Sequence, residues 1–289
     1  MLPGTTYNIK LNNNQLKGNM FQNRKQEQIL LIGPWIGEFG WELFCWQGHI
    51  RRISKNYKKV VVISRPGHKF LYQDFCDEFI EFKTPLNAVV DSWRCSGIDN
   101  NKIRNLTKNI RHDVKLSPVN IGFLIFGDGR MQLSENFKNQ EFIKYKSNSL
   151  EKHFDILIHP RNRKVGNLRN WNKDKWEILV NKLSNDYKIA TIGTNESIHI
   201  EGTEDLRNIS IEDTVSVMNR TKLVVGPSSG PMHLASLSGA PHLVWSEAYN
   251  KNRYLIAWNP FKTPVVFYDK ENWNPSVNNI YSKIIEILK

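Results

Sequence analysis

The chain is poor in cysteine and contains no long apolar run. Its three cysteines, Cys45, Cys76 and Cys95, are odd in number and widely spaced among 289 residues. Such spacing fits neither a metal site nor a disulfide framework, so we expect reduced thiols and a cytoplasmic protein. No run of about 18 apolar residues predicts a membrane span. Residues 1–27 are polar, lack a secretory pattern and are interpreted as a loose tail.

Several nucleotide-binding and metal-binding motifs are also missing. No phosphate-binding P-loop is present, and no Gly-x-Gly-x-x-Gly run opens a helix, which excludes the usual ATPase and dinucleotide sites. No Asp-x-Asp pair and no His/Cys cluster has metal-ligand spacing. We therefore predict no bound metal and no cofactor.

Positive charge is abundant and unevenly divided. Residues 1–150 hold 22 basic and 13 acidic residues, a balance of +9, whereas residues 151–289 hold 18 and 15, a balance of +3. A basic first half favours an acidic partner such as nucleic acid, a phosphorylated glycan or an anionic membrane surface. A solubilising surface rich in lysine is the alternative.

Short apolar runs alternate with helical patterns along the chain, which is typical of βαβ units and parallel sheets. We predict an α/β fold of two Rossmann-like domains facing across a cleft, over residues 28–145 and 150–275, with a polar linker within 131–152. The predicted strands are 28–33, 60–64, 121–126, 155–159, 188–192, 222–225 and 242–245, and the predicted helices are 42–54, 69–79, 173–184, 212–219, 231–238 and 276–288.

The segment 223–239, Leu-Val-Val-Gly-Pro-Ser-Ser-Gly-Pro-Met-His-Leu-Ala-Ser-Leu-Ser-Gly, predicts a strand, a tight turn and a helix N-terminus. Free N–H groups and the helix dipole favour an anion there. Ser228 and Ser229 can cap the helix or donate hydroxyls to a phosphate. An ordinary turn with a serine cap is the alternative.

This segment resembles the donor-site signature of GT-B glycosyltransferases, most closely the heptosyltransferase-like family 9. That family carries Gly-x-Asp-Ser-Gly-Pro-Met-His-Leu-Ala, a small-residue helix and a Gly-x-Pro exit. The match spans roughly residues 155–250, and Ser228 stands where the family usually has Asp. The resemblance implies a nucleotide-diphosphate-sugar donor in the second domain, the acceptor in the first, and a final helix (276–289) that can cross back to the first. It assigns the donor to Ser228, Ser229, Gly230, Pro231, Met232 and His233.

The family also carries a basic residue before a tryptophan that opens the next helix, and Arg169-Asn170-Trp171 resembles that pattern. Arg161 and Arg163 are equally well placed to pair with a diphosphate. By position, we expect Thr194 near the base or ribose, and Glu247 near the ribose or a sugar hydroxyl.

Glu38 is the candidate catalytic base, in a loop (33–42) with three glycines and two tryptophans. Gly37-Glu38 resembles a family Gly-Asp pair whose carboxylate is thought to take the acceptor proton. The alternative is that Glu38 caps the first helix. The other acceptor-side candidates are Trp35, Trp41, Glu42, His49, Arg65, His68 and Asp128.

Three functions remain open. The first is a metal-independent, inverting glycosyltransferase acting on a hydroxymethylated base in DNA, as phage enzymes do, in which case the compartment is the host cytoplasm. The second is a transferase of surface polysaccharide or lipopolysaccharide core. The third is a non-catalytic protein that binds a nucleotide-sugar or nucleic acid. The first is narrowly preferred because of the basic first half and the aromatic loop.

Overall fold

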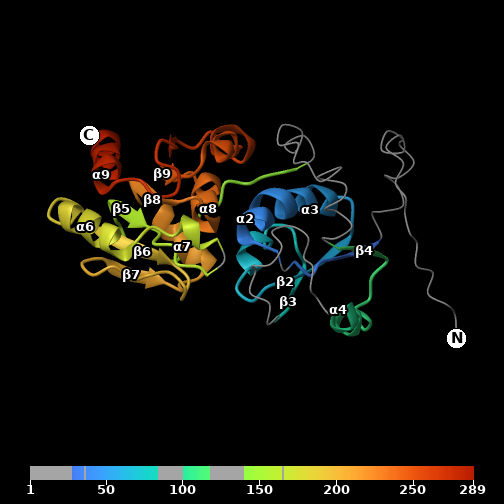
Figure 1. Ribbon diagram of the computed structural model, residues 1–289. Coiled ribbons are helices and arrows are strands. Elements are labelled where there is room, and N and C mark those ends of the chain that lie inside the picture. The colour runs from blue at the N-terminus through green and yellow to red at the C-terminus, as the bar shows by residue number, and fades with distance from the viewer. Residues whose placement is uncertain (1–27, 36, 84–99, 118–139, 165) are drawn as a thin grey trace, which may run out of the picture.

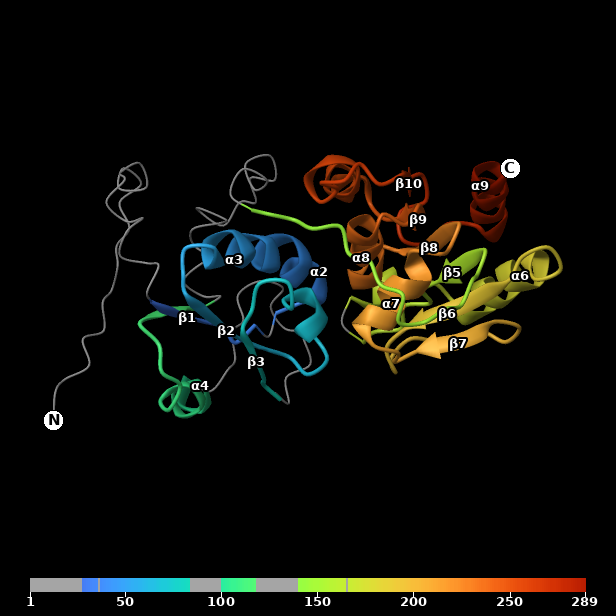
Figure 2. The ribbon, with the colours of Figure 1, turned by 180° about the vertical axis from the view of Figure 1, so that it is seen from behind.

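The structure is a computed structural model that describes residues 28–35, 37–83, 100–117, 140–164 and 166–289, apart from the side chains of residues 100, 102 and 103. These residues form two α/β domains, each built on a parallel sheet (Figures 1 and 2). The predicted fold class is confirmed. No helix in the described ranges is both long and apolar enough to cross a membrane.

The first domain contains a four-stranded sheet in the order β3-β2-β1-β4. Strand β1 is apolar and pairs in parallel with both β2 and β4, so the chain order reverses beside β1. Ligands bind at such reversals, outside the carboxyl ends of the strands. The strands are β1 (Ile29–Ile32), β2 (Lys59–Ser64), β3 (Glu78–Glu81) and β4 (Val114–Leu116).

A nearly continuous helical segment follows β1 and lies against this sheet (Figure 1). The predicted helix over 42–54 is confirmed within it. The predicted helix over 69–79 is wrong, because a single short turn and then β3 occupy this region. The helices of the domain are α2 (Phe39–Trp41), η3 (Glu42–Trp46), α3 (Gln47–Ser54), η4 (Lys69–Leu71) and α4 (Asn100–Thr107).

The second domain has a six-stranded sheet in the order β10-β9-β8-β5-β6-β7, with the reversal between β5 and β8. Four of its strands were predicted from apolar runs. The strands are β5 (Ile156–Ile158), β6 (Ile189–Gly193), β7 (Glu204–Arg207), β8 (Leu223–Pro227), β9 (His242–Trp245) and β10 (Val265–Tyr268). The predicted strand over 121–126 lies outside the described residues.

The helices of this domain cover both faces of its sheet, as the parallel strands require. The predicted helices near 173–184, 212–219 and 231–238 are confirmed. The helices are η6 (Asn167–Arg169), α6 (Lys173–Leu183), α7 (Ile211–Met218), α8 (Gly230–Ser238), η7 (Ala248–Asn250), η8 (Arg253–Ala257) and α9 (Val277–Leu288).

Helix α9 packs within the second domain instead of crossing to the first. Its buried Ile280 and Ile284 join the apolar cluster of Trp176 and Trp245, and α9 contacts α6. Both views place α9 at the side of the second domain away from the first (Figures 1 and 2). The crossing that the family resemblance implied is therefore corrected: the apolar face of α9 is already covered by its own domain.

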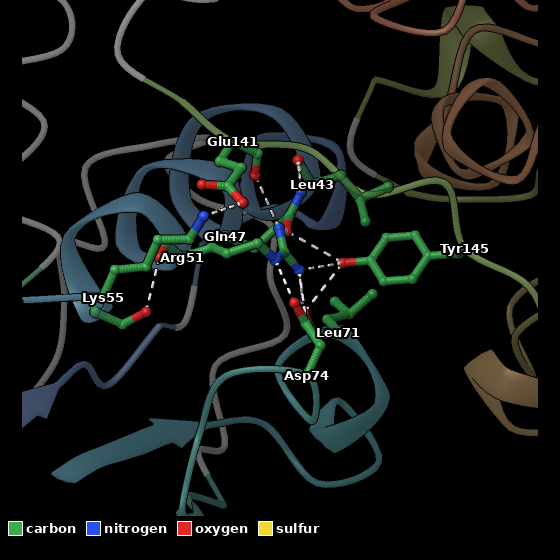
Figure 3. Close-up of polar contacts among 9 residues, drawn as sticks. Leu43, Gln47, Arg51, Lys55, Leu71, Asp74, Glu141 and Tyr145 are labelled. Carbon is green, nitrogen blue, oxygen red and sulfur yellow. Dashed lines mark hydrogen bonds and ion pairs between the residues drawn. The ribbon is translucent and has the colours of Figure 1, made fainter. Parts of the chain in front are cut away.

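The connecting segment, which joins the two domains and contains Glu141 and Tyr145, is held on the first domain by Arg51 (Figure 3). Arg51 donates to Asp74 Oδ2 at 2.7 Å, to the carbonyl of Glu141 at 3.0 Å, and also to Gln47 and Tyr145. Only 2% of its side chain is exposed. A buried arginine with this many acceptors is fully satisfied, so it acts as a structural anchor.

Candidate functional site

A cavity of about 820 Å³ lies between the two domains. Its walls come from the segments that follow β1, β2, β5, β6 and β8, at the carboxyl ends of both sheets. This is where parallel α/β sheets bind ligands. Thirteen of the predicted site residues line it, namely Glu38, Trp41, Arg65, His68, Arg161, Arg163, Arg169, Thr194, Ser228, Ser229, Gly230, Pro231 and His233.

The N-terminus of α8 opens into this cavity. Ser229 precedes the helix in extended backbone, but its hydroxyl forms no capping bond and is buried without a partner in the described structure. Tyr254 instead forms hydrogen bonds with both serines. Its Oη accepts from the Ser229 N–H at 3.2 Å and donates to Ser228 Oγ at 3.0 Å. Ser228 is thus held by Tyr254, and the simple serine cap is not formed.

Two glycines allow the domains to approach each other beside this helix. A Cβ on Gly230 would lie 2.8 Å from Cδ1 of Phe39, and one on Gly40 would lie 2.9 Å from Cδ2 of His233. Both distances are shorter than real contacts permit. Glycine at these positions therefore lets α2 of the first domain pack directly on α8 of the second.

The loop after β5 places three arginines on the cavity wall. Arg161 is buried, and its Nη1 donates to the carbonyl of Gly166 at 2.9 Å and to Asn170 Oδ1. Burial, together with Arg169 and Arg163, lowers the pKa of Arg161 to about 10. Arg161 therefore remains protonated at neutral pH, and the three cations attract a phosphate or another anion.

Thr194, at the end of β6, lines the cavity, and so does His159. His159 was not identified as a site residue from the sequence. Nδ1 of His159 lies 3.2 Å from the carbonyl oxygen of Ile192. Burial lowers the pKa of His159 to about 4. The ring is therefore neutral at pH 7 and adds no charge to the cavity.

Glu38 enters the cavity from the first domain at the start of α2. It makes no side-chain capping bond to that helix, so the alternative role as a helix cap is not supported. The residue is half-buried, and its charge acts on both Arg161 and Arg253 of the second domain. A carboxylate from one domain thus faces cations of the other.

Glu42 lies beneath the cavity instead of lining it. It is completely buried and accepts from Ser64 Oγ at 2.8 Å, from Tyr72 and from Nδ1 of His68 at 2.7 Å. Burial by itself would raise the pKa of Glu42, but His68, Arg65 and Tyr72 bring it below its ordinary value. Glu42 therefore positions His68, whose ring reaches the cavity wall.

Four other candidates do not line the cavity in the described structure. Trp35 is 3% exposed and stacks on Trp46 at 5.4 Å, so its ring belongs to the core. Met232 is a fully buried residue of α8, and His49 lies on α3. Glu247 is held by Trp273, whose Nε1 donates to it at 2.6 Å. Asp128 lies outside the described residues.

Other cavity residues were missed because segments outside the predicted loops bring them there. Arg253 and Trp258 belong to the segment after β9, and both line the cavity. Trp258 stacks on Phe44 of the first domain at 5.1 Å and meets Trp41 edge-on at 5.2 Å. No local motif marks either residue. Within the described ranges no group of three or more His, Cys, Asp or Glu side chains has the geometry to hold a metal ion.

Several solved structures with the same fold are glycosyltransferases. The glycosyl transferase family 9 protein of Veillonella parvula DSM 2008 aligns with TM-score 0.56 and 10% identity over 93% of this chain and 99% of its own. E. coli ADP-heptose lps heptosyltransferase II aligns with TM-score 0.60 and 12% identity, over 90% and 98%. E. coli heptosyltransferase WaaC with ADP gives 0.54 and 13%, over 90% and 99%.

No protein-family model matches the chain, and no curated protein matches it significantly. At 10–13% identity, the structural similarity shows the fold. The resemblance inferred from residues 226–241 is confirmed at this level. The chain has the two-domain GT-B architecture of the heptosyltransferase structures.

Proposed function

We propose that this protein is a glycosyltransferase that transfers a sugar from a nucleotide-diphosphate-sugar to a hydroxyl of an acidic acceptor. The observation that carries the proposal is the cavity between the domains. In it, Glu38 of the first domain faces the arginines and the α8 N-terminus of the second. A base on one side and an anion site on the other are what such a transfer requires.

The second domain supplies the groups for the donor. The diphosphate lies at the N-terminus of α8, where the Ser229 hydroxyl lacks a partner in the described structure, with Arg161, Arg163 and Arg169 around it. These cations neutralise the charge that develops as the nucleoside diphosphate leaves. The proposal therefore needs no metal ion. Thr194, at the end of β6, lies toward the nucleoside.

Glu38 then acts on the acceptor. Its carboxylate takes the proton of the acceptor hydroxyl while that oxygen attacks the anomeric carbon from the face opposite the diphosphate. The bond between the anomeric carbon and the phosphate oxygen breaks, its electron pair leaves with the nucleoside diphosphate, and the configuration is inverted. Trp41, Arg65 and His68 line the first domain's part of the cavity, where the acceptor binds.

The acceptor class we favour is a saccharide of a surface polysaccharide or lipopolysaccharide core. The similar structures support this choice, since two of them are heptosyltransferases and one of these is an ADP-heptose lps heptosyltransferase. Nucleotide-sugars of adenosine are accordingly the first donors to test. The basic first half of the sequence fits a phosphorylated glycan.

A hydroxymethylated base in DNA is the second candidate, and it too is favoured by the charge of +9 in residues 1–150. Binding to duplex DNA through several phosphates weakens steeply between low and physiological salt. Weak or salt-insensitive binding would eliminate this candidate.

The test is a transfer assay on the full chain. Nucleotide-sugars of all common bases are incubated with hydroxymethylated DNA or with phosphorylated core oligosaccharides, and products are identified by mass. A sugar mass added to either acceptor supports transfer and identifies the acceptor class. Donor binding without transfer to any acceptor would favour the non-catalytic alternative, and absence of donor binding would contradict the proposal.

A further inference from the structure

Arg253 is a cation at the domain junction that forms no ion pair in the described structure. Its guanidinium carbon lies 4.6 Å from the ring centre of Trp258 and 5.6 Å from that of Trp41. Its Nε is buried without a hydrogen-bond partner, and the guanidinium forms no hydrogen bond or ion pair with any described residue. One face of the cation is covered by tryptophan, and its donors remain unused.

Arg51, which has a structural role, provides a comparison for the hydrogen bonding of Arg253. Arg51 is buried, and Arg253 is half-buried. Arg51 is surrounded by acceptors from Asp74, Gln47 and Glu141 (Figure 3), whereas Arg253 has none. The fold does not use the hydrogen-bond donors of Arg253, so it does not explain why an arginine stands at this half-buried position.

Arg253 lines the cavity, so a ligand bound in the cavity can reach its guanidinium. Arg253 lines it together with Glu38, whose negative charge acts on Arg253 without forming an ion pair. Stacking on an indole leaves the in-plane N–H groups of a guanidinium available for two parallel bonds to an oxyanion. Arg65 and the three arginines of the β5 loop also line the cavity.

We propose that Arg253 binds an anionic oxygen group of a reactant, a phosphate or a carboxylate, at the junction of the two domains. The inference rests on the proposed function and extends it by naming a charged group that must lie beside Glu38. Two sources supply this chemistry: the diphosphate of the donor and an acidic substituent of the acceptor. Arg253 contacts Trp41 of the first domain and Trp258 of the second. An anion bound to Arg253 therefore also links the two domains.

The test compares wild type with R253M, which keeps side-chain bulk without charge, and R253K, which keeps charge without the planar fork. R104M removes an exposed arginine on α4 and serves as the matched control. Calorimetry with inorganic pyrophosphate and ADP reports the donor source. Glucuronate and glucose 6-phosphate, titrated with ADP present, report the acceptor source. Thermal unfolding without ligand checks that each variant is folded.

We expect R253M to lose about tenfold or more in affinity for one pair of probes, R253K to lose less, and R104M to bind as wild type does. Loss confined to pyrophosphate and ADP assigns the donor diphosphate, and loss confined to the sugar acids assigns the acceptor. We also expect the Tm of R253M without ligand to equal or exceed that of wild type, because an uncompensated charge is removed.

Equal binding of all four probes by wild type and R253M would overturn the inference, as would the absence of binding of any of them to wild type. A clear drop in the Tm of ligand-free R253M with unchanged affinities would assign Arg253 a structural role instead. Binding that depends on Arg253 without sugar transfer to any acceptor would preserve the anion site and remove the proposed function.

Discussion

Nδ1 of His68 lies 2.7 Å from Oε2 of Glu42, so a completely buried carboxylate holds a histidine ring at the wall of the cavity. The contact joins the helical segment after β1 to the loop after β2. Glu42 was a candidate for direct contact with the acceptor, but the structure shows that it positions His68 instead.

Replacing Glu42 with glutamine should destabilise the first domain. A buried carboxylate that loses its charge leaves His68, Tyr72 and Ser64 with a poorer acceptor, and we expect a loss of about 3 kcal/mol at pH 7. Since the folded pKa of Glu42 is lowered, its contribution is fully present above pH 4.5 and is lost as pH falls through the folded value.

Urea unfolding of wild type and E42Q at pH 7 and at lower pH measures both effects. The difference in unfolding free energy between wild type and E42Q should become smaller below pH 4.5. A constant gap across this range would mean that the charge of Glu42 does not contribute to stability.

The buried histidines should make the protein sensitive to mild acid. Burial lowers the pKa of His159 and of His242 to about 4. The unfolded chain therefore binds more protons between pH 6.5 and 4, and stability falls as pH falls through this window. At pH 5 we expect a loss of about 2 kcal/mol per histidine.

Unfolding free energies at pH 7.5, 6 and 5 test this loss, with H242Q as the comparison because His242 lies in the core away from the cavity lining. H242Q should lose less stability than wild type between pH 7.5 and 5. Parallel curves for the two proteins would show that His242 is not buried in its neutral form.

Arg51 and Arg253 should respond oppositely to the same substitution. R51M leaves Asp74 without its buried partner and should cost about 3–5 kcal/mol in unfolding free energy. The exposed control R104M should change it by about 0.5 kcal/mol or less. If R51M unfolded at the same denaturant concentration as R104M, the connecting segment would not be anchored as Figure 3 indicates.

Arg169 should contribute to nucleotide binding more than its neighbour in the same loop. It lines the cavity, whereas Lys164 is exposed and does not. Losing one charge-assisted contact to a phosphate should weaken nucleoside diphosphate binding about tenfold or more. Calorimetric Kd values for R169M and K164M test this expectation, and equal values would remove Arg169 from the donor site.

Much of the fold could be predicted because buried parallel strands are continuous apolar runs, as in β1 and β8. Strand β3 was missed because Glu78 and Glu81 flank only two apolar residues at the sheet edge. Residues 71, 75 and 79 are apolar at four-residue spacing, which imitates a helix where a short turn forms.

The second domain's part of the cavity was predictable because many of its residues are consecutive at strand ends. Arg253 was not, since its significance depends on its contact with Trp41, which lies far away in the sequence and in the other domain. Trp35 was misassigned because a tryptophan in a glycine-rich loop suggests ligand stacking, but the loop turns this ring toward Trp46 and the core.

The central claim is that Glu38 acts as a base opposite a nucleotide-sugar site. The most direct measurement is the kcat of sugar transfer by E38Q at saturating donor, beside its Kd for the nucleoside diphosphate, with E78Q as the acid-to-amide control outside the cavity. The account predicts that E38Q loses about 100-fold or more in kcat, keeps its Kd within about threefold, and that E78Q resembles wild type. An E38Q protein that transfers sugar at the wild-type rate would contradict it.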